Sequence, residues 1–214
     1  MARYGMVIDL QRCNGCYTCV AACKVENGTQ PGVFWARLVQ DEQGKYPTAR
    51  RVFLPMLCLH CKEAPCVEVC PTGATIKRED GIVYIDNTKC VGCRYCIIAC
   101  PFDNRYFIDQ IRTYFPGHLT PYEEFKINQF QHQTGVTQKC NFCMHRIDEG
   151  IRRGLKPGVD RDATPACVNM CITNARYFGD LDDPNSEVSQ LIATRKGEQL
   201  HPELGTNPSV YYLW

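Results

Sequence analysis

Sixteen cysteines fall into four groups of four in this chain of 214 residues, and no cysteine lies outside the groups. The groups are Cys13/Cys16/Cys19/Cys23, Cys58/Cys61/Cys66/Cys70, Cys90/Cys93/Cys96/Cys100 and Cys140/Cys143/Cys167/Cys171. A cubane iron–sulfur cluster takes four cysteine thiolates. The count therefore predicts four [4Fe–4S] clusters as cofactors, with all sixteen cysteines as iron ligands. Four clusters leave little room for a substrate pocket, so we expect electron transfer and no catalytic residues.

The spacing within the first and third groups is C-x2-C-x2-C-x3-C, and Pro101 follows the third group. Three cysteines on one tight loop can hold three corners of a cubane, and the fourth usually ligates the other cluster of a pair. Structural zinc sites instead use two separated pairs of ligands. The second group, C-x2-C-x4-C-x3-C before Pro71, is a slight expansion of the same loop. These three groups therefore favour iron–sulfur clusters over zinc.

The fourth group is less specific, because 23 residues separate Cys143 from Cys167. Taken alone, this spacing fits a structural zinc knuckle as well as a cubane. Its Cys-x3-Cys ending is followed by Thr173 and Ala175, much as Cys70 is followed by Pro-Thr-Gly-Ala. The fourth group therefore favours a cluster, and zinc is the alternative.

Crossed ligation assigns the sixteen cysteines to four sites. Groups two and three are separated only by residues 71–89, as in a two-cluster ferredoxin, so they form one pair. This pair comprises site C, with Cys58, Cys61, Cys66 and Cys100, and site D, with Cys90, Cys93, Cys96 and Cys70. The remaining groups form site A, with Cys13, Cys16, Cys19 and Cys171, and site B, with Cys140, Cys143, Cys167 and Cys23.

An internal repeat indicates a ferredoxin-like fold. The run Ile-Asp-x3-Cys that ends at Cys13 returns at Cys90, each time after a short apolar strand. A turn at residues 79–81 should join residues 74–76 to residues 82–85 in a two-stranded hairpin. The predicted fold class is therefore α+β, with two nested bacterial-ferredoxin-like units, short hairpins, short helices and loop insertions.

We expect these units to form one compact body. The outer unit combines residues 1–57 with 140–214, the inner unit spans residues 58–101, and residues 102–139 form an insertion. The insertion holds eight aromatic residues, which either shield clusters from water or form a docking surface. Asp183 and Pro184 predict the start of a terminal helix that Gly197 ends. The apolar end, residues 208–214, should dock on this subunit or on a partner.

Charge and hydropathy exclude several other classes. The formal net charge of +1 argues against a nucleic-acid partner. Apolar stretches fall far short of the roughly 18–20 residues of a membrane span, and residues 1–10 show no export signal. Disulfides are disfavoured, because the C-x2-C-x2-C triplets place sulfurs too close in sequence for ordinary pairing.

Bound clusters would change the charge balance, since four oxidised cubanes take the net charge from +1 to about −7. Lys139, Lys89 and Arg12 each directly precede a cysteine. They either offset this charge or are ordinary exposed side chains. His60 lies inside the second cysteine loop, where it either packs or hydrogen-bonds a cluster sulfur. His145 follows Cys143 closely, but a full cysteine set requires no histidine ligand.

Several segments resemble one family. These are the four ferredoxin-type motifs, the Cys-Pro-Thr-Gly-Ala unit from Cys70, residues 174–184 (Asn-Ala-Arg-Tyr-Phe-Gly-Asp-Leu-Asp-Asp-Pro), residues 5–10 and residues 202–208. Together they resemble the iron–sulfur subunit of complex iron–sulfur molybdoenzymes. The family comprises relatives of dimethyl sulfoxide, polysulfide, tetrathionate and respiratory arsenate reductases. The resemblance covers nearly the whole chain and is specific for the subunit type, not for the substrate.

The resemblance implies partners. One is a large catalytic subunit that holds molybdenum or tungsten on two pyranopterins, and the other is a membrane subunit that exchanges electrons with quinone. It also implies co-export with the catalytic subunit, and hence a membrane-attached complex on the periplasmic side; a cytoplasmic location is the alternative. A free cytoplasmic polyferredoxin that serves a hydrogenase or formate enzyme is the alternative function. A structural zinc protein is a third hypothesis.

Overall fold

The computed structural model describes residues 2–130 and 132–214, so Met1 of the predicted outer unit and Gln131 of the insertion lie outside the described residues. The strands are β1 (Tyr4–Asp9), β2 (Ala36–Gln43), β3 (Arg50–Leu57), β4 (Thr75–Lys77), β5 (Val83–Ile85), β6 (Tyr106–Ile108), β7 (Val136–Gln138), β8 (Arg176–Asp180), β9 (Glu198–Gln199) and β10 (Val210–Leu213). The helices are α1 (Thr18–Asn27), α2 (Pro65–Glu68), α3 (Tyr95–Ile98), α4 (Pro121–Phe130), α5 (Met144–Arg152), α6 (Ala166–Asn169) and α7 (Glu187–Arg195), with 3-10 turns at Arg161–Ala163 and Pro202–Leu204. This mixture of short strands and helices fits the predicted α+β class.

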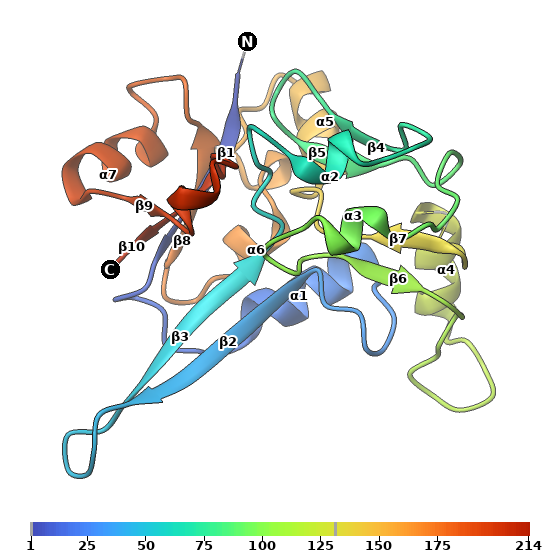
Figure 1. Ribbon diagram of the computed structural model, residues 1–214, viewed down its shortest axis with the longest axis horizontal. Coiled ribbons are helices and arrows are strands. Elements are labelled where there is room, and N and C mark those ends of the chain that lie inside the picture. Colours follow the sequence, from blue (N-terminus) through green and yellow to red (C-terminus); the bar gives the residue numbers. More distant parts are fainter. Residues whose placement is uncertain (1, 131) are drawn as a thin grey trace.

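One four-stranded sheet, in the order β8-β1-β10-β9, joins the two ends of the chain (Figure 1). β1 lies between β8, its antiparallel partner, and β10, its parallel partner. All six residues of β1 are buried, as expected for a strand that is covered on both faces. In β10, the buried hydroxyl of Tyr212 donates to the carbonyl of Pro55 at 2.9 Å. The apolar end of the chain therefore docks on this subunit, which is one of the two predicted outcomes.

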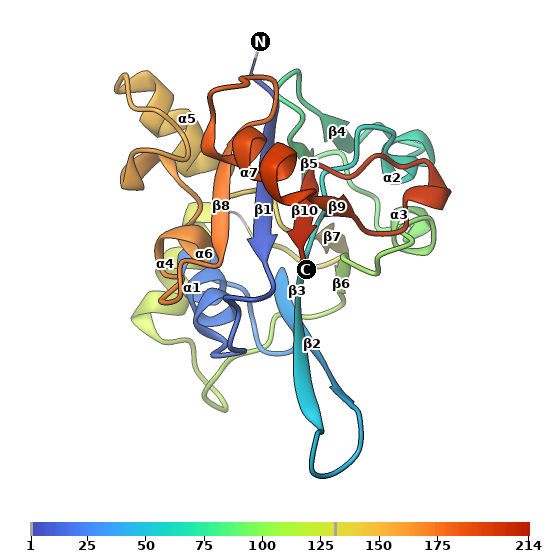
Figure 2. The same ribbon diagram turned by 90° about the vertical axis from the view of Figure 1, so that its left-hand side faces the viewer.

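Three two-stranded hairpins complete the strands. β4 and β5 pair antiparallel, which confirms the predicted hairpin around residues 79–81. β6 and β7 pair within the aromatic insertion. β2 and β3 pair over eight residues each and project from the body as a long arm (Figures 1 and 2). The outer part of this arm is exposed and polar on both faces, so its sequence lacks the alternation that predicts a hairpin.

The internal repeat of the sequence is also a repeat of backbone geometry. Gly15 and Gly92 follow the first cysteine of their groups by two residues, with φ of 72° and 67°. Tyr17 and Arg94 then adopt φ of 61° and 65° and cap the starts of α1 and α3. Turns of this kind gather backbone N–H groups into a concavity that suits an anion. The two loops therefore offer the same backbone environment to their cysteines.

The terminal helix begins three residues later than predicted. The hydroxyl of Ser186 caps α7 by accepting a hydrogen bond from the Ser189 N–H at 3.2 Å. Asp183 instead closes the preceding turn, where its carboxylate accepts from the Asn185 N–H at 2.9 Å. Asp and Ser are equally good N-cap residues, so the sequence alone does not show which of the two begins the helix. The predicted end holds, because Gly197 lies just beyond the last helical turn.

The apolar core and the cysteines are not separate regions. Phe142 packs edge-on against Phe178, with ring centroids 5.2 Å apart, and stacks on His60 at 3.7 Å. Cys140 and Cys167 belong to the same buried cluster of side chains. Because sulfur forms part of this interior, metal binding and folding should be coupled.

Candidate iron–sulfur sites

Two of the predicted cysteine sets line separate cavities between α2, α3 and the β4–β5 hairpin. Cys58, Cys61, Cys66 and Cys100 of site C line one cavity. Cys70, Cys90, Cys93 and Cys96 of site D line the other. In each set, one cysteine comes from the other group, as crossed ligation requires. The structure therefore brings these cysteines together, while their binding of a cluster stays a prediction.

The first and fourth groups meet in the same crossed way. Cys13, Cys16, Cys19 and Cys171 of site A line a third cavity. Cys23, Cys140, Cys143 and Cys167 of site B are all buried. Burial raises the pKa of Cys23, and the other three site B thiols raise it further. The side-chain amide of Asn27 contacts the sulfur of Cys23 at 3.6 Å and that of Cys143 at 3.8 Å.

The free, buried thiols suit a chain that binds clusters better than a chain without metal. All sixteen cysteines are free thiols. Among residues 2–130 and 132–214, no three His, Cys, Asp or Glu side chains converge on a single metal-ion position. Burial raises the pKa of Cys61 and of Cys143 to about 12. Thiolates at these positions therefore need a strongly positive centre, such as cluster iron, beside them.

Buried donors without partners occur beside the same cysteines. Nη2 of Arg105, Nη2 of Arg176 and Nε2 of His60 are buried and have no hydrogen-bond partner within the described part of the chain. Nδ1 of His60 accepts from the Val83 N–H at 3.0 Å, so Nε2 carries the ring proton. A buried donor without an acceptor is costly, and the sulfurs of an anionic cluster would satisfy it. The residues present thus fit [4Fe–4S] clusters.

Backbone N–H groups already point at cysteine sulfurs. The Thr75 N–H donates to the sulfur of Cys70 at 3.4 Å, and the Ala175 N–H donates to that of Cys171 at 3.2 Å. Both donors follow the last cysteine of their group by four or five residues. Hydrogen bonds of this kind favour the thiolate form. The sequence similarity between the segments after groups two and four therefore has a structural counterpart.

Cysteines of one site affect the pKa of groups in the next, in the order A–B–C–D. Burial raises the pKa of Cys167 in site B, and Cys19 of site A adds to this rise. Burial also raises the pKa of Cys140 in site B, with further contributions from Cys167 and from Cys58 of site C. Burial lowers the pKa of Arg105, but Cys66 of site C and Cys96 of site D help to raise it overall. Arg105 thus lies close to both sites.

Three buried cations lie among these sites. Lys139 is 3% exposed and donates to the carbonyl oxygens of Val83 and Cys140, so its predicted role in offsetting buried charge is compatible with its position. Arg105 and Arg176 are each 4% exposed, and sequence analysis did not single them out. A positional signal was present, because each follows the last cysteine of its group by five residues.

The other two predicted cations are exposed. The side chains of Lys89 and Arg12 are 57% and 54% accessible to solvent, and each forms an ion pair with the aspartate three residues earlier, Asp86 or Asp9. Their positions in the two repeats correspond. For both residues the plainer interpretation, an exposed side chain, describes the structure.

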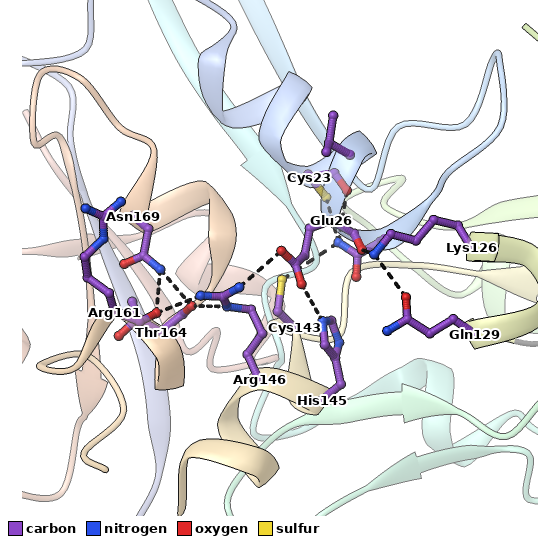
Figure 3. A network of polar contacts seen from close by, with 12 residues as sticks. Cys23, Glu26, Lys126, Gln129, Cys143, His145, Arg146, Arg161, Thr164 and Asn169 are labelled. Atoms are coloured by element: carbon purple, nitrogen blue, oxygen red, sulfur yellow. Dashed lines mark hydrogen bonds and ion pairs between the residues drawn. The ribbon is translucent and has the colours of Figure 1, made fainter. Parts of the chain in front are cut away.

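A polar network joins α1 to α5 beside site B (Figure 3). The carboxylate of Glu26 in α1 accepts from Nε2 of His145 at 2.8 Å and from Arg146 at 3.2 Å. Arg146 also donates to the carbonyl oxygens of Thr164 and Arg161, both at 2.8 Å. His145 is thus engaged with Glu26, and the network holds the helices next to Cys23 and Cys143 in place.

Comparisons with known proteins find 4Fe-4S domains and iron–sulfur subunits. Two family models, each described as a 4Fe-4S dicluster domain, match residues 12–74 and residues 49–115. The arsenate respiratory reductase iron-sulfur subunit ArrB of Shewanella sp. is 39% identical over 242 residues, which cover 99% of this chain and 96% of that protein. The B subunit of selenate reductase from Mesobacillus selenatarsenatis is 41% identical over 218 residues (97% and 70%). The B subunit of tetrathionate reductase from Salmonella typhimurium is 39% identical over 217 residues (99% and 72%).

Proposed function

The chain belongs to the family of iron–sulfur subunits of dimethyl sulfoxide, arsenate, selenate and tetrathionate reductases, and from this premise we propose that it relays electrons through four [4Fe–4S] clusters. Its partners would be a molybdenum- or tungsten-pterin catalytic subunit and a quinone-reactive membrane subunit. When bound, the clusters supply one-electron redox centres. The chain itself binds them, spaces them and sets their surroundings, and it has no catalytic role of its own.

The observation that carries this proposal is the linked order A–B–C–D. Cys19 of site A and Cys58 of site C pack against the core cluster that holds Cys140 and Cys167 of site B, and Arg105 lines site C and contacts Thr75 of site D. Sites A and D are thus the ends of one path through the protein. Each of these end sites has an exposed cysteine, Cys16 or Cys93, as a path that delivers electrons to other proteins requires.

Exposed apolar side chains surround both ends. Near site A, Tyr17 is 45% and Ile172 is 68% exposed, and near site D, Val91 is 66% and Ile98 is 83% exposed. Apolar groups gathered at the surface indicate protein–protein contact. Two such surfaces, one at each end, suit a subunit that is held between two partners. They favour this arrangement over a freely diffusing polyferredoxin.

The proposal includes the nested arrangement, with the pair of sites C and D enclosed by the pair of sites A and B. The crossed cysteine sets and the sheet that joins β1 to β8 and β10 support it. None of the described residues forms a helix that is long and apolar enough to cross a membrane. Attachment to the membrane would then come through a partner, on the periplasmic side if the complex is exported with its catalytic subunit.

Anaerobic purification with metal analysis tests the proposal. The expected result is about sixteen iron atoms per chain, without zinc, together with a pterin-containing large subunit that co-purifies. About twelve iron atoms and one zinc atom would assign zinc to the fourth group. A soluble monomer with full iron content and no large subunit would instead support a free polyferredoxin.

A further inference from the structure

Arg105 and Arg176 occupy equivalent positions in the two halves of the chain. Arg105 follows Cys100 by five residues, and Arg176 follows Cys171 by five residues. In both cases the preceding cysteine is the one that crosses to the other group's site. Both arginines are 4% exposed. A long charged side chain is rarely buried to this extent without a counter-charge, so the repeated placement needs an explanation.

Arg176 lies in the gap between sites A and B. It lines the site A cavity together with Cys13 and Cys171. Its Nη1 also contacts the sulfur of Cys167, in site B, at 3.7 Å. Burial alone would lower the pKa of Arg176, yet Cys167 and Cys19 raise it overall. The guanidinium therefore faces thiols of both sites.

Arg105 lies in the corresponding gap between sites C and D. It lines the site C cavity together with Cys66 and Cys100. Its Nη1 donates to the hydroxyl of Thr75 at 3.4 Å, and Thr75 lines the site D cavity. Burial alone would lower the pKa of Arg105, yet cysteines of both sites raise it overall. The two arginines thus have the same relation to their pairs of sites.

Neither guanidinium has an ordinary counter-ion. In the part of the chain that the structure describes, their hydrogen-bond partners are sulfur atoms and one hydroxyl, and Nη2 of each has no partner. Lys139 differs, because two backbone carbonyls accept from its ammonium group. A buried cation that lacks a carboxylate is strongly unfavourable. Clusters bound at the cysteines would supply this missing negative charge.

We propose that Arg176 and Arg105 are positioning residues that raise the reduction potentials of the clusters on either side, Arg176 for sites A and B and Arg105 for sites C and D. This inference rests on the proposed four-cluster function. Reduction adds one electron to a cluster and makes it more negative by one charge. A fixed positive charge in a medium of low dielectric constant stabilises that added charge. Arginine stays protonated throughout, so no proton accompanies the electron.

The test is a spectroscopically monitored redox titration of the intact complex with Arg176→Gln, Arg105→Gln and the two corresponding lysine variants. In each glutamine variant, two of the four clusters should show at least a tenfold lower ratio of reduced to oxidised form at a fixed ambient potential. For a one-electron couple this is a shift of about 59 mV. The two clusters affected by Arg176→Gln should be the two that Arg105→Gln leaves unchanged. The shift should be the same at pH 6.5 and pH 8, within the roughly neutral range in which arginine does not titrate.

The lysine variants separate charge from structure. Because they keep the positive charge, they should keep nearly native potentials. A lysine variant with full iron content whose potentials shift as much as those of the glutamine variant would overturn the proposal. Unshifted potentials in both glutamine variants, or equal shifts of all four clusters, would also overturn it. Should a glutamine variant lose a cluster, the lysine variant is compared with wild type, and a shift of about 59 mV or more in its two clusters would overturn the proposal.

Arg153→Gln is the matched control, because its side chain is 51% exposed and pairs with Asp162 at the surface. It removes the same formal charge and should shift no cluster. Iron content of the wild-type complex is measured first. A wild-type value far below about sixteen would contradict the proposed function, whereas a full value with unshifted variants would contradict only the role of the arginines.

Discussion

The side-chain amide of Asn27 lies 3.8 Å from the sulfur of Cys143, a residue 116 positions away in the chain. Asn27 is 1% exposed, and the same amide contacts the sulfur of Cys23 at 3.6 Å. One donor thus serves two cysteines of site B that come from opposite parts of the chain. α1 and α5 are held in register at this point, with the Glu26 network beside it (Figure 3).

Replacement of Asn27 by alanine should therefore weaken site B selectively. A hydrogen bond to a charged acceptor contributes about 1.5–3 kcal/mol, and this variant removes the donor from two thiolates at once. We expect loss of up to about four iron atoms per chain in the presence of a chelator, while the other sites keep theirs. Asn185→Ala, at an exposed position, is the control. Equal iron loss in the two variants would show that the contact has no role.

The conformation of Gly92 should be essential for site D. Its φ is 67°, and a Cβ there would lie 2.2 Å from the carbonyl oxygen of Gly135. Gly73 has a similar φ of 63° but no atom within 4 Å of its would-be Cβ. Gly73→Ala should then cost only about 1–2 kcal/mol for the left-handed backbone. Gly92→Ala also forces backbone groups apart, so we expect it to lose the site D iron.

These two alanine variants form a matched pair, since both place a Cβ on a left-handed residue near site D. Iron content and the midpoint of urea denaturation, followed by cluster absorbance, measure the difference. If Gly73→Ala were as damaging as Gly92→Ala, left-handed strain alone would account for both. The close approach of Gly135 would then be irrelevant.

Much of the site follows from local sequence, because a short cysteine loop determines which sulfurs lie near one another. Gly15 and Gly92 show this, since their repeated position corresponds to a repeated backbone turn. The cations show the opposite. Lys89 and Lys139 both directly precede a cysteine, yet Lys89 lies in an exposed loop, whereas β7 leads Lys139 into the interior. Burial of this kind depends on tertiary packing that no local pattern specifies.

The buried arginines and the projecting arm were missed for related reasons. Arg105 and Arg176 owe their importance to the gaps between sites, which exist only after distant groups have come together. The β2–β3 arm has no apolar face over its outer part, so the periodicity that predicts strands is absent there. The middle of the arm is nevertheless specific, because a Cβ on Gly15 would lie only 2.4 Å from the ring of Phe53.

Because of the Glu26 network, the free energy of unfolding should decrease as the pH becomes acidic. The hydrogen bond from His145, with the nearby charge of Arg146, holds the pKa of Glu26 below its ordinary value. A lowered folded-state pKa means that the stabilisation is complete above the unfolded pKa, about 4.3, and is lost as the pH falls through the folded value. Glu26→Gln should therefore lower the free energy of unfolding at pH 7, measured by urea denaturation, by no more than about 1 kcal/mol. Wild type and variant should converge once the pH falls below the folded-state pKa of Glu26, and a difference that persists unchanged there would exclude this linkage.

The exposed isoleucines at the two ends should be needed for assembly and not for cluster binding. Ile98 is 83% exposed near site D, and Ile172 is 68% exposed near site A. Each isoleucine changed to glutamate should weaken binding of one partner by at least about fivefold, as expected for interface residues that cost more than 1 kcal/mol when lost. Val159→Glu, 78% exposed elsewhere on the surface, is the control.

Pull-down of the assembled complex measures this effect, with iron content confirming that each variant is fully loaded. Ile98→Glu and Ile172→Glu should release different partners, because their sites lie at opposite ends of the path. Release of the same partner by both variants would mean that the two surfaces form one interface. In that case sites A and D could not be the two ends of the relay.

Removal of iron should unfold the chain unevenly. Within the described residues, the strands that line the cavities of sites C and D belong to two-stranded hairpins, β4–β5 and β6–β7, and an isolated two-stranded hairpin is marginally stable in water. The central sheet has a small core of its own, in which Val7, Val188 and Leu213 are at most 1% exposed and no cysteine takes part. Hydrogen-exchange mass spectrometry after anaerobic chelation should therefore show early loss of protection in residues 58–101 and later loss in β1, β10 and α7.

The physical reason is that cluster ligation supplies folding free energy where apolar burial does not. Val7, Val188 and Leu213 pack together without any cysteine, so the sheet should keep part of its stabilisation when iron is lost. Simultaneous loss of protection throughout the chain would show that the sheet depends on the clusters as strongly as the cysteine loops do. A chain that stays fully protected without iron would contradict the view that its cysteine sites are part of its core.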